Sequence, residues 1–380
     1  MNQVKEIKEV TRSIKPQTKM LLLAVTAGRC EICNNLVIKD SFTGKDIFYG
    51  EAAHIYAFNE GGARSKKVKL YDNNFKNLLL ACPDCHTKID KKGQVKYYSA
   101  EYLKRLKMEH EKRIKTVTGF NPHRRTKILR LMANIKNETV KISQHEIISA
   151  LLPERLYPCE DVCEEIDFTS TAGLENSIYW KSKMQEADQI LNKFYSDLKR
   201  DKIEHVCVFG LGPIPLLMYL GSKLDNKIAT KLFQRHRDGE GWNWNKGKPK
   251  AEYKFNSVQK GKIKNRVALL LSLSGTVNRD LLPPTVKNSY AIYELAVNPE
   301  PNYNFLRSEK DLHNFETSFT TAISVIKNKH KGLKDIEMFP AVPAPIAIAC
   351  GRLLNKNSDP RLKIFNTYSK NKFKYSLTIN

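Results

Sequence analysis

Long apolar segments are the first thing that this sequence lacks. No run of 18 or more consecutive apolar residues occurs among its 380 residues, so we expect no transmembrane helix. The amino terminus mixes charged residues into its opening and lacks the apolar core of a signal peptide. No internal repeat and no low-complexity tract is apparent. These absences predict a soluble, cytoplasmic protein that has no membrane partner.

Acidic residues are scarce in comparison with basic ones. The chain holds 40 Asp and Glu against 64 Lys and Arg, which gives a formal net charge of +24. Residues 1–130 alone hold 27 basic and 13 acidic residues. Such a surplus suits a polyanion, because Lys and Arg displace counterions from a phosphate backbone. Charge alone leaves open the alternative of a solvated basic face.

Cysteine is also sparse, and its placement is informative. Four of the eight cysteines form two Cys-x-x-Cys pairs, Cys30/Cys33 and Cys82/Cys85. The other four show no metal-ligand spacing: Cys159, Cys163, Cys207 and Cys350. In a reducing compartment, such pairs indicate a metal site rather than disulfides.

The two cysteine pairs are separated by 48 residues, far more than in a simple zinc finger. If the intervening chain folds back, the four thiolates make a closed tetrahedral site, for which Zn²⁺ is the natural occupant. A closed site of this kind is structural. Two unrelated buried pairs are the disfavoured alternative.

The length of the chain predicts two domains and a connector. We expect a first domain over residues 1–120, in which Ser99 caps a helix that ends at Gly119. Residues 121–169 are predicted to be a polar, helical connector. Over residues 170–380, buried strands alternate with helices, which favours a largely parallel, Rossmann-like α/β sheet. Expected strands are 205–209, 267–272, 290–297, 336–339 and 362–365.

Four polar residues beside the cysteine pairs suit phosphodiester hydrolysis. That reaction requires a base to activate water and a cation to neutralise charge on the phosphate. His54, at the end of a predicted strand, is the candidate base. His86 and Asp90, at positions i and i+4, would share a helix face and could ligate one cation. The Asn77 amide could brace the loop that orients the base.

These residues resemble the HNH (ββα-metal) endonuclease motif over roughly residues 28–92. The resemblance rests on Glu51–Ile55, on Asn77–His86 and on Asp90. It implies an α+β nuclease domain with His54 as base, Asn77 as the loop-holding asparagine and His86 as ligand of a catalytic Mg²⁺ or Mn²⁺. Many members place a further ligand directly before the base, where this chain has Ala53. The missing ligand would be Asp90, with Glu51 as the alternative.

The second half of the chain carries features that suit a nucleotide ligand. A Gly-x-Gly follows a predicted strand and allows close approach of a phosphate, although tight packing is the alternative. The polar segment 234–244 combines two tryptophans with arginines, which can stack on bases and grip phosphates. A structural loop anchored by tryptophan is its alternative. The predicted ligand-binding residues are Gly210, Gly212, Gln234, Arg237, Trp242 and Trp244.

Together with Phe339–Ala344, which leads into an apolar helix, these features resemble the SAVED domain over about residues 170–380. SAVED domains are Rossmann-like sensors of cyclic oligonucleotides in bacterial CBASS anti-phage systems. An HNH domain followed by SAVED resembles the CBASS effector nucleases. The resemblance implies that a cyclic di- or trinucleotide binds the sensor, drives formation of a homo-oligomer and licenses non-specific cleavage of double-stranded DNA.

The sequence is compatible with two other functions. The protein could be a restriction endonuclease in which Trp242 and Trp244 clamp a DNA base. Alternatively, the four-cysteine site could belong to a DNA-binding module without activity, although His54 and His86 in the order of the family argue against this.

Overall fold

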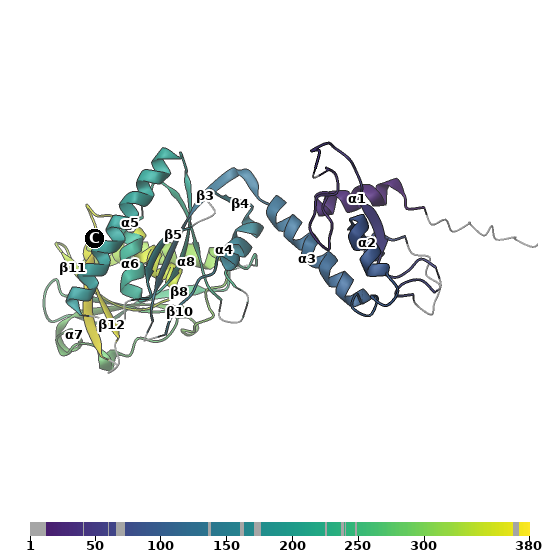
Figure 1. Ribbon diagram of the computed structural model, residues 1–380. Helices are drawn as coiled ribbons and strands as arrows, with labels where there is room; N and C mark the ends of the chain where they lie inside the picture. Colours follow the sequence, from purple (N-terminus) through teal and green to yellow (C-terminus); the bar gives the residue numbers. More distant parts are fainter. Residues whose placement is uncertain are drawn as a thin grey trace, which may run out of the picture. The chain divides into compact units, whose positions relative to one another are not determined.

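The computed structural model describes residues 13–40, 42–59, 61–65, 73–135, 138–159, 163–170, 176–224, 226–236, 239, 241–247, 249–367 and 372–380. The chain divides into two compact units, Met1–Phe120 (unit 1) and Asn121–Asn380 (unit 2) (Figure 1). The first domain boundary expected from the sequence coincides with this division. None of the helices among the described residues combines the length and apolar character needed to cross a bilayer.

Unit 1 is a small α+β unit whose helices begin where local chemistry favours them. Helix α1 has a proline in its first turn, where the missing N–H is not needed, and ends at Ala27 in the left-handed conformation. Ser99 caps α3 by accepting a hydrogen bond from the Tyr102 amide, as the sequence predicted. The elements are α1 (Pro16–Thr26), β1 (Glu51–His54), η1 (Phe75–Asn77), β2 (Leu78–Ala81), α2 (Pro83–Asp90) and α3 (Ala100–Thr118).

Strands β1 and β2 form a two-stranded antiparallel sheet, against which α2 packs. The register places Glu51 opposite Ala81 and His54 opposite Leu78. All four residues of β2 are buried, and the core beneath the sheet includes three of the four paired cysteines. The order β1, β2, α2 therefore surrounds a core that contains three of the four paired cysteines.

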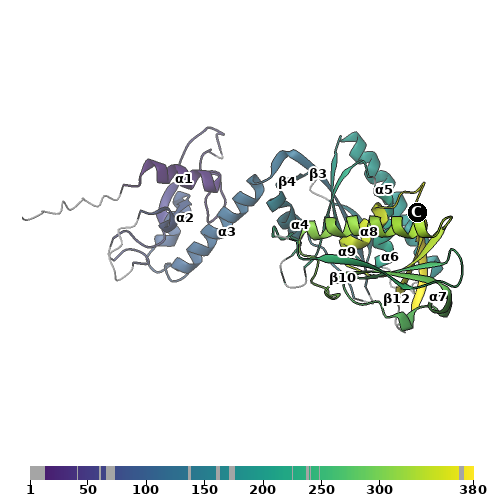
Figure 2. The ribbon, with the colours of Figure 1, turned by 180° about the vertical axis from the view of Figure 1, so that it is seen from behind.

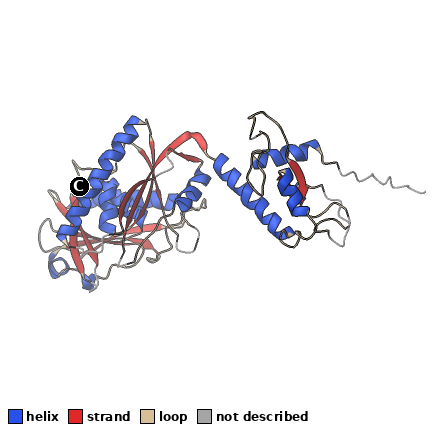
Figure 3. Ribbon diagram, viewed as in Figure 1, coloured by secondary structure: helices blue, strands red, loops and turns tan. Residues whose placement is uncertain are grey.

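Unit 2 contains two sheets with helices packed on them (Figure 3). The first sheet runs β4-β3-β6-β7, and β5 pairs with the carboxyl-terminal part of β3. All of its pairings are parallel. Its elements are β3 (Asn121–Ala133), α4 (Gln144–Leu151), η2 (Leu152–Glu154), β4 (Leu156–Pro158), β5 (Glu164–Phe168), α5 (Ser177–Arg200), β6 (His205–Leu211), α6 (Ile214–Lys223) and β7 (Ala229–Phe233).

The second sheet has the order β13-β12-β11-β9-β10-β8. Its four central strands are parallel, and the edge strands β8 and β13 are antiparallel to their neighbours. Helix α8 packs against β8 and α9. The view from behind shows α8 beside α9 (Figure 2). The elements are β8 (Glu252–Gln259), β9 (Val267–Ser272), η3 (Arg279–Leu281), α7 (Pro284–Ser289), β10 (Ala291–Asn298), α8 (Glu309–Lys329), β11 (Asp335–Ala341), α9 (Ala344–Arg352), β12 (Arg361–Thr367) and β13 (Phe373–Ile379).

The two halves of unit 2 repeat one topology, although no repeat is apparent in the sequence. In the first half, β3-α4-β5-α5-β6-α6-β7 gives the parallel order β5-β3-β6-β7. In the second, β9-α7-β10-α8-β11-α9-β12 gives the equivalent order β10-β9-β11-β12. Strand β6 begins at His205 and β11 at Asp335, 130 residues later. Few identical residues accompany the repeated topology, and this is why the sequence conceals it.

Glycines recur at this spacing where the two halves meet. Helices α6 and α9 cross so closely that a Cβ on Gly221 would lie 1.9 Å from the Ile348 carbonyl oxygen. The equivalent Cβ on Gly351 would lie 2.0 Å from the Met218 carbonyl oxygen. Only glycine fits at these two points, because the approaching atoms belong to backbone. The crossing holds the two halves of unit 2 together through equivalent residues.

The predicted helical connector over residues 121–169 is wrong. Unit 2 begins at Asn121, and the described residues of this segment form the strands β3, β4 and β5 and the short α-helix α4. Strand β3 is central in its sheet, and residues 128–133 are apolar except for Arg130. A parallel strand that is buried on both faces has no polar alternation. The basic residues before it made the segment look like a solvated connector.

Candidate active site

Two loops and the first turn of α2 bring the four paired cysteines together. Their sulfur atoms all lie within 4.8 Å of one another, and the Sγ atoms of Cys33 and Cys82 are 3.8 Å apart. Tetrahedral zinc with Zn–S bonds of about 2.3 Å separates its sulfur ligands by about 3.8 Å. The donor set and its spacing therefore fit one Zn²⁺ ion.

A buried glutamate between the first two cysteines fixes their loop to the sheet. The Glu31 amide donates to the Leu80 carbonyl at 2.8 Å, and a Glu31 carboxylate oxygen accepts from the Leu80 amide at 2.5 Å. The first cysteine loop is thereby tied to β2, whose end leads directly to Cys82. Sequence reasoning did not identify Glu31, because a glutamate inside a Cys-x-x-Cys pair has no distinguishing spacing.

His54 occupies the last position of β1 and is half-buried. Its Nε2 lies 2.9 Å from the Asn73 Oδ1 atom, while the Asn73 Nδ2 donates to the Ser13 carbonyl at 3.3 Å. The second contact fixes the orientation of the amide, so Oδ1 must accept and Nε2 must carry the proton. The neutral His54 ring therefore presents a lone pair at Nδ1, which is the form that a general base requires.

Asn77 is buried and holds the chain just beyond His54. Its Oδ1 accepts a hydrogen bond from the Tyr56 amide at 2.9 Å, and its Nδ2 donates to the Tyr56 carbonyl at 3.0 Å. Its own carbonyl accepts from the Ile55 amide at 2.8 Å. The side chain thus fixes both polar backbone groups of one residue, which is the bracing geometry that the sequence led us to expect.

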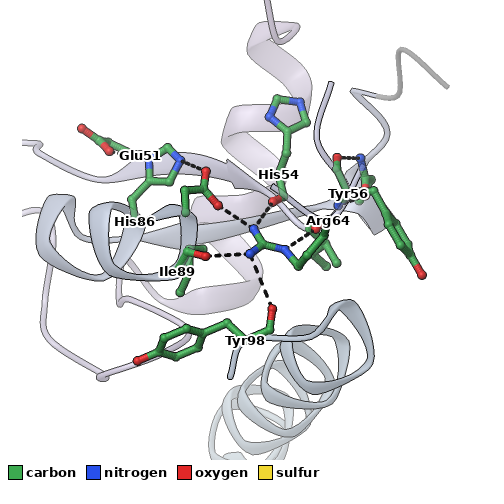
Figure 4. Close-up of polar contacts among 10 residues, drawn as sticks. Glu51, His54, Tyr56, Arg64, His86, Ile89 and Tyr98 are labelled. Atoms are coloured by element: carbon green, nitrogen blue, oxygen red, sulfur yellow. Dashed lines mark hydrogen bonds and ion pairs between the residues drawn. The ribbon is translucent and has the colours of Figure 1, made fainter. Parts of the chain in front are cut away.

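His86, on α2, lies between two carboxylates. Its Nδ1 is 2.6 Å from a Glu51 oxygen, and its Nε2 is 3.6 Å from an Asp90 oxygen (Figure 4). The contact with Asp90 raises the pKa of the His86 imidazole, and Glu51 adds to this increase against the effect of partial burial. Both candidate carboxylates thus reach His86, but from opposite nitrogens of the ring. Among the described residues, only the cysteines gather three or more donors around one point.

Asp90 has a second partner that the sequence did not reveal. The Arg64 Nη2 atom lies 2.6 Å from the Asp90 Oδ1. Partial burial raises the pKa of Asp90, but the contacts with His86 and Arg64 outweigh it, so the pKa lies below its ordinary value. Arg64 lies in the segment Gly61-Gly62-Ala63-Arg64-Ser65, and no residue adjacent in sequence marks it as a buried arginine.

Gly210 and Gly212, which the sequence predicted to approach a phosphate, are both buried. A Cβ on Gly210 would lie 2.9 Å from the Leu217 side chain, and one on Gly212 would lie 3.2 Å from the Ala133 Cβ. Both glycines therefore serve close packing of β6 against its neighbours. This is the alternative that the sequence left open.

The predicted stacking tryptophans are also core residues. Trp242 is 1% exposed and packs edge-on against Phe209, and Trp244 donates its indole N–H to the Leu232 carbonyl at 2.9 Å. Neither ring presents a free face to a base. Gln234 donates to the neighbouring carbonyl of Arg235, and Arg237 lies outside the described residues. The described part of the segment is a structural loop anchored by tryptophan.

We therefore expect Trp242→Ala to destabilise unit 2 by about 3–5 kcal/mol, the usual loss when a buried large aromatic residue is truncated. Chemical denaturation followed by fluorescence and circular dichroism measures this effect. Tyr303→Ala is the matched control, because Tyr303 is 58% exposed. A Trp242→Ala protein of parental stability that binds nucleotide more weakly would restore the stacking role.

Comparison with known protein families identifies the family to which most of unit 2 is similar. The family model described as "SMODS-associated and fused to various effectors sensor domain" (SAVED) matches residues 186–379, about half of the chain. No curated protein matches the sequence.

Solved structures similar to this chain include a Cap4 SAVED/CARF-domain containing receptor of Acinetobacter baumannii with the cyclic trinucleotide 3'3'3'-cAAA. It has a TM-score of 0.47 and 10% identity, over 78% of this chain and 61% of that one. The same receptor with 2'3'3'-cAAA has a TM-score of 0.45 and 11% identity, with the same coverage of both chains. The Cap4 SAVED/CARF-domain containing receptor of Moraxella osloensis has a TM-score of 0.41 and 10% identity, over 75% of this chain and 60% of that one. This chain thus spans about three fifths of the length of these structures.

Proposed function

The chain belongs to the SAVED family of sensor domains, and on this premise we propose that unit 2 binds a cyclic oligonucleotide that activates a metal-dependent HNH endonuclease in unit 1. In this proposal the ligand drives association of the chains, and the associated protein cleaves double-stranded DNA without marked sequence preference. The biological role would be defence against phage.

The observation that carries the nuclease half is the arrangement around His54. The histidine ends β1, its tautomer is set by Asn73, and the chain beyond it is held by Asn77. His86 projects from α2, which packs on the same two strands, and contacts Glu51 of β1 at 2.6 Å. A base in the correct tautomer and a histidine–carboxylate pair are the groups that phosphodiester hydrolysis requires.

Each residue then has a definite task. His54 accepts the proton of the attacking water at Nδ1, while the hydrogen bond from Nε2 to Asn73 stabilises the imidazolium that results. Asn77 keeps the backbone after His54 from shifting as the phosphate enters. His86 and a carboxylate would hold Mg²⁺ or Mn²⁺, which when bound neutralises charge on the scissile phosphate and the leaving oxygen. The basic surplus of residues 1–130 supplies attraction for the DNA backbone.

For the ligand of unit 2, the carboxyl ends of the central parallel strands are the natural location, because ligands of open α/β sheets bind there. Asn134 directly follows β3, and its buried Oδ1 has no hydrogen-bond partner among the described residues. Its Nδ2 donates to the Thr169 carbonyl at 2.8 Å, so the oxygen is held in place. An exocyclic amine or hydroxyl of a nucleotide would satisfy this acceptor once binding uncovers it.

One experiment tests the proposal. The purified full-length protein is incubated with supercoiled plasmid and Mg²⁺ or Mn²⁺, with and without a panel of cyclic dinucleotides and trinucleotides. We expect degradation into small fragments only with one or a few of these ligands, and a gain of mass in light scattering with the same ligands. Ligand-free cutting at fixed sites would indicate a restriction endonuclease, and no cutting under any condition would indicate a DNA-binding module.

A further inference from the structure

Arg64 is the most completely bonded side chain beside the candidate active site. Its side chain is 5% exposed, although it lies in a loop. Each of its five N–H donors has an acceptor. Nε donates to the Ile55 carbonyl at 2.7 Å, and Nη1 donates to the carbonyls of Ile89 at 2.7 Å and Tyr98 at 3.5 Å. Nη2 donates to the His54 carbonyl at 3.3 Å and to the Asp90 Oδ1 at 2.6 Å. One guanidinium thus joins the end of β1, the end of α2 and the segment before α3 (Figure 4).

We propose that Arg64 and Asp90 are positioning residues, and that Glu51 rather than Asp90 shares the catalytic cation with His86. In this arrangement Arg64 holds Asp90, and Asp90 faces the His86 Nε2 as an ion-pair partner. The Nδ1 atom of His86 is then left as the metal-binding nitrogen, facing Glu51. This inference rests on the proposed nuclease function and deepens it by assigning its metal ligands.

The charges around Asp90 argue against a cation there. One of its oxygens is bound to the Arg64 guanidinium at 2.6 Å, and the other faces the His86 Nε2 at 3.6 Å. A divalent cation at this carboxylate would lie beside a buried positive charge that cannot lose its proton. Glu51 pairs with no cationic residue except His86 among the described residues and is half-exposed, so a hydrated metal can reach it.

The histidine chemistry leads to the same assignment. A histidine that ligates a metal through one nitrogen commonly donates its other ring N–H to a carboxylate, which fixes the tautomer and the ring orientation. Asp90 is the carboxylate that faces the His86 Nε2, at 3.6 Å and one helical turn away, and it is itself held by Arg64. Glu51 lies two residues before Ala53 and so shares its strand face. The glutamate can therefore supply the carboxylate that Ala53 cannot.

Mn²⁺ binding to the full-length, zinc-loaded protein tests the assignment without relying on activity. Free Mn²⁺ is followed by electron paramagnetic resonance for the parent protein and for Glu51→Gln, Asp90→Asn and Glu109→Gln. Glu109 is the matched control, because it forms an exposed ion pair with Arg105 on α3 of the same unit. We expect Glu51→Gln to lose the site and Asp90→Asn to weaken it by about 10–100-fold, since an amide cannot accept from both Arg64 and His86. Glu109→Gln should bind Mn²⁺ like the parent.

Two further measurements distinguish a positioning role of Arg64 from a role in folding, and locate the residues that ligate the metal. Arg64→Lys keeps the positive charge but loses the five-donor fork, and its folded fraction, measured by thermal melting, should bind Mn²⁺ more weakly than the parent. The anomalous signal of manganese in crystals of His54→Ala should lie at Glu51 and His86. A signal at Asp90, parental Mn²⁺ affinity in Glu51→Gln, or parental affinity in folded Arg64→Lys would overturn the assignment. A parent protein that binds no Mn²⁺ would overturn the proposed nuclease itself.

Discussion

Replacement of His54 by alanine is expected to lower the rate of DNA cleavage by about 10²–10⁴-fold, the usual loss when a general base is removed. Alanine leaves no group at the end of β1 that can take the proton of the attacking water. Neither Asn73 nor Asn77 can replace it, because an amide is not a base at neutral pH. The measurement is the initial rate of plasmid cleavage by the activated full-length protein at saturating Mg²⁺.

The effect should be confined to chemistry. Because the His54 side chain is only half-buried, its loss should change thermal stability little, even though the hydrogen bond to Asn73 is removed. Zinc content, Mn²⁺ affinity and ligand-induced association should match the parent protein. His313→Ala is the matched control, because His313 is 77% exposed on α8 of the other unit. Cleavage by His54→Ala at a rate within a few-fold of the parent would remove His54 from the role of base.

Local signals made much of the fold predictable. The cap at Ser99 and the buried run of β9 were located correctly because each depends on residues adjacent in sequence. The two Cys-x-x-Cys pairs likewise indicated one metal-binding cluster, and their sulfur atoms do converge. The resemblance of residues 170–380 to the SAVED domain is confirmed over residues 186–379. The HNH assignment stays a prediction that the geometry around His54 supports.

Features that depend on distant contacts were missed or misread. Arg64 acquires its role only when β1, α2 and the segment before α3 converge on one guanidinium. Trp242 and Trp244 looked like stacking platforms because their neighbours in sequence are polar, yet both rings are buried. Gly221 and Gly351 matter because two helices 130 residues apart cross there. Sequence periodicity reports burial on one element, not which partner covers it.

Removal of the metal from the cysteine cluster should have the largest effect on stability. We expect Cys85→Ser to release zinc and to unfold unit 1, since apparent binding energies at structural zinc sites are about 10–16 kcal/mol. Cys30, Cys82 and Cys85 are buried in the core of the unit and not at its edge. The same α2 that carries Cys85 also carries His86, so activity should be lost together with the fold. Elemental analysis and calorimetry measure the two effects.

Loss of the metal should unfold unit 1 without unfolding unit 2. Units 1 and 2 have separate cores, so the calorimetric transition of unit 1 should disappear while that of unit 2 and its nucleotide binding persist. Cys159→Ser is the matched control, because Cys159 lies in unit 2 outside any metal-binding group among the described residues. It should retain about one zinc per chain and both transitions. A Cys85→Ser protein that keeps full zinc and an intact unit 1 would show that the four cysteines do not act as one site. The position of α2, and of His86 on it, would then depend on contacts other than the metal.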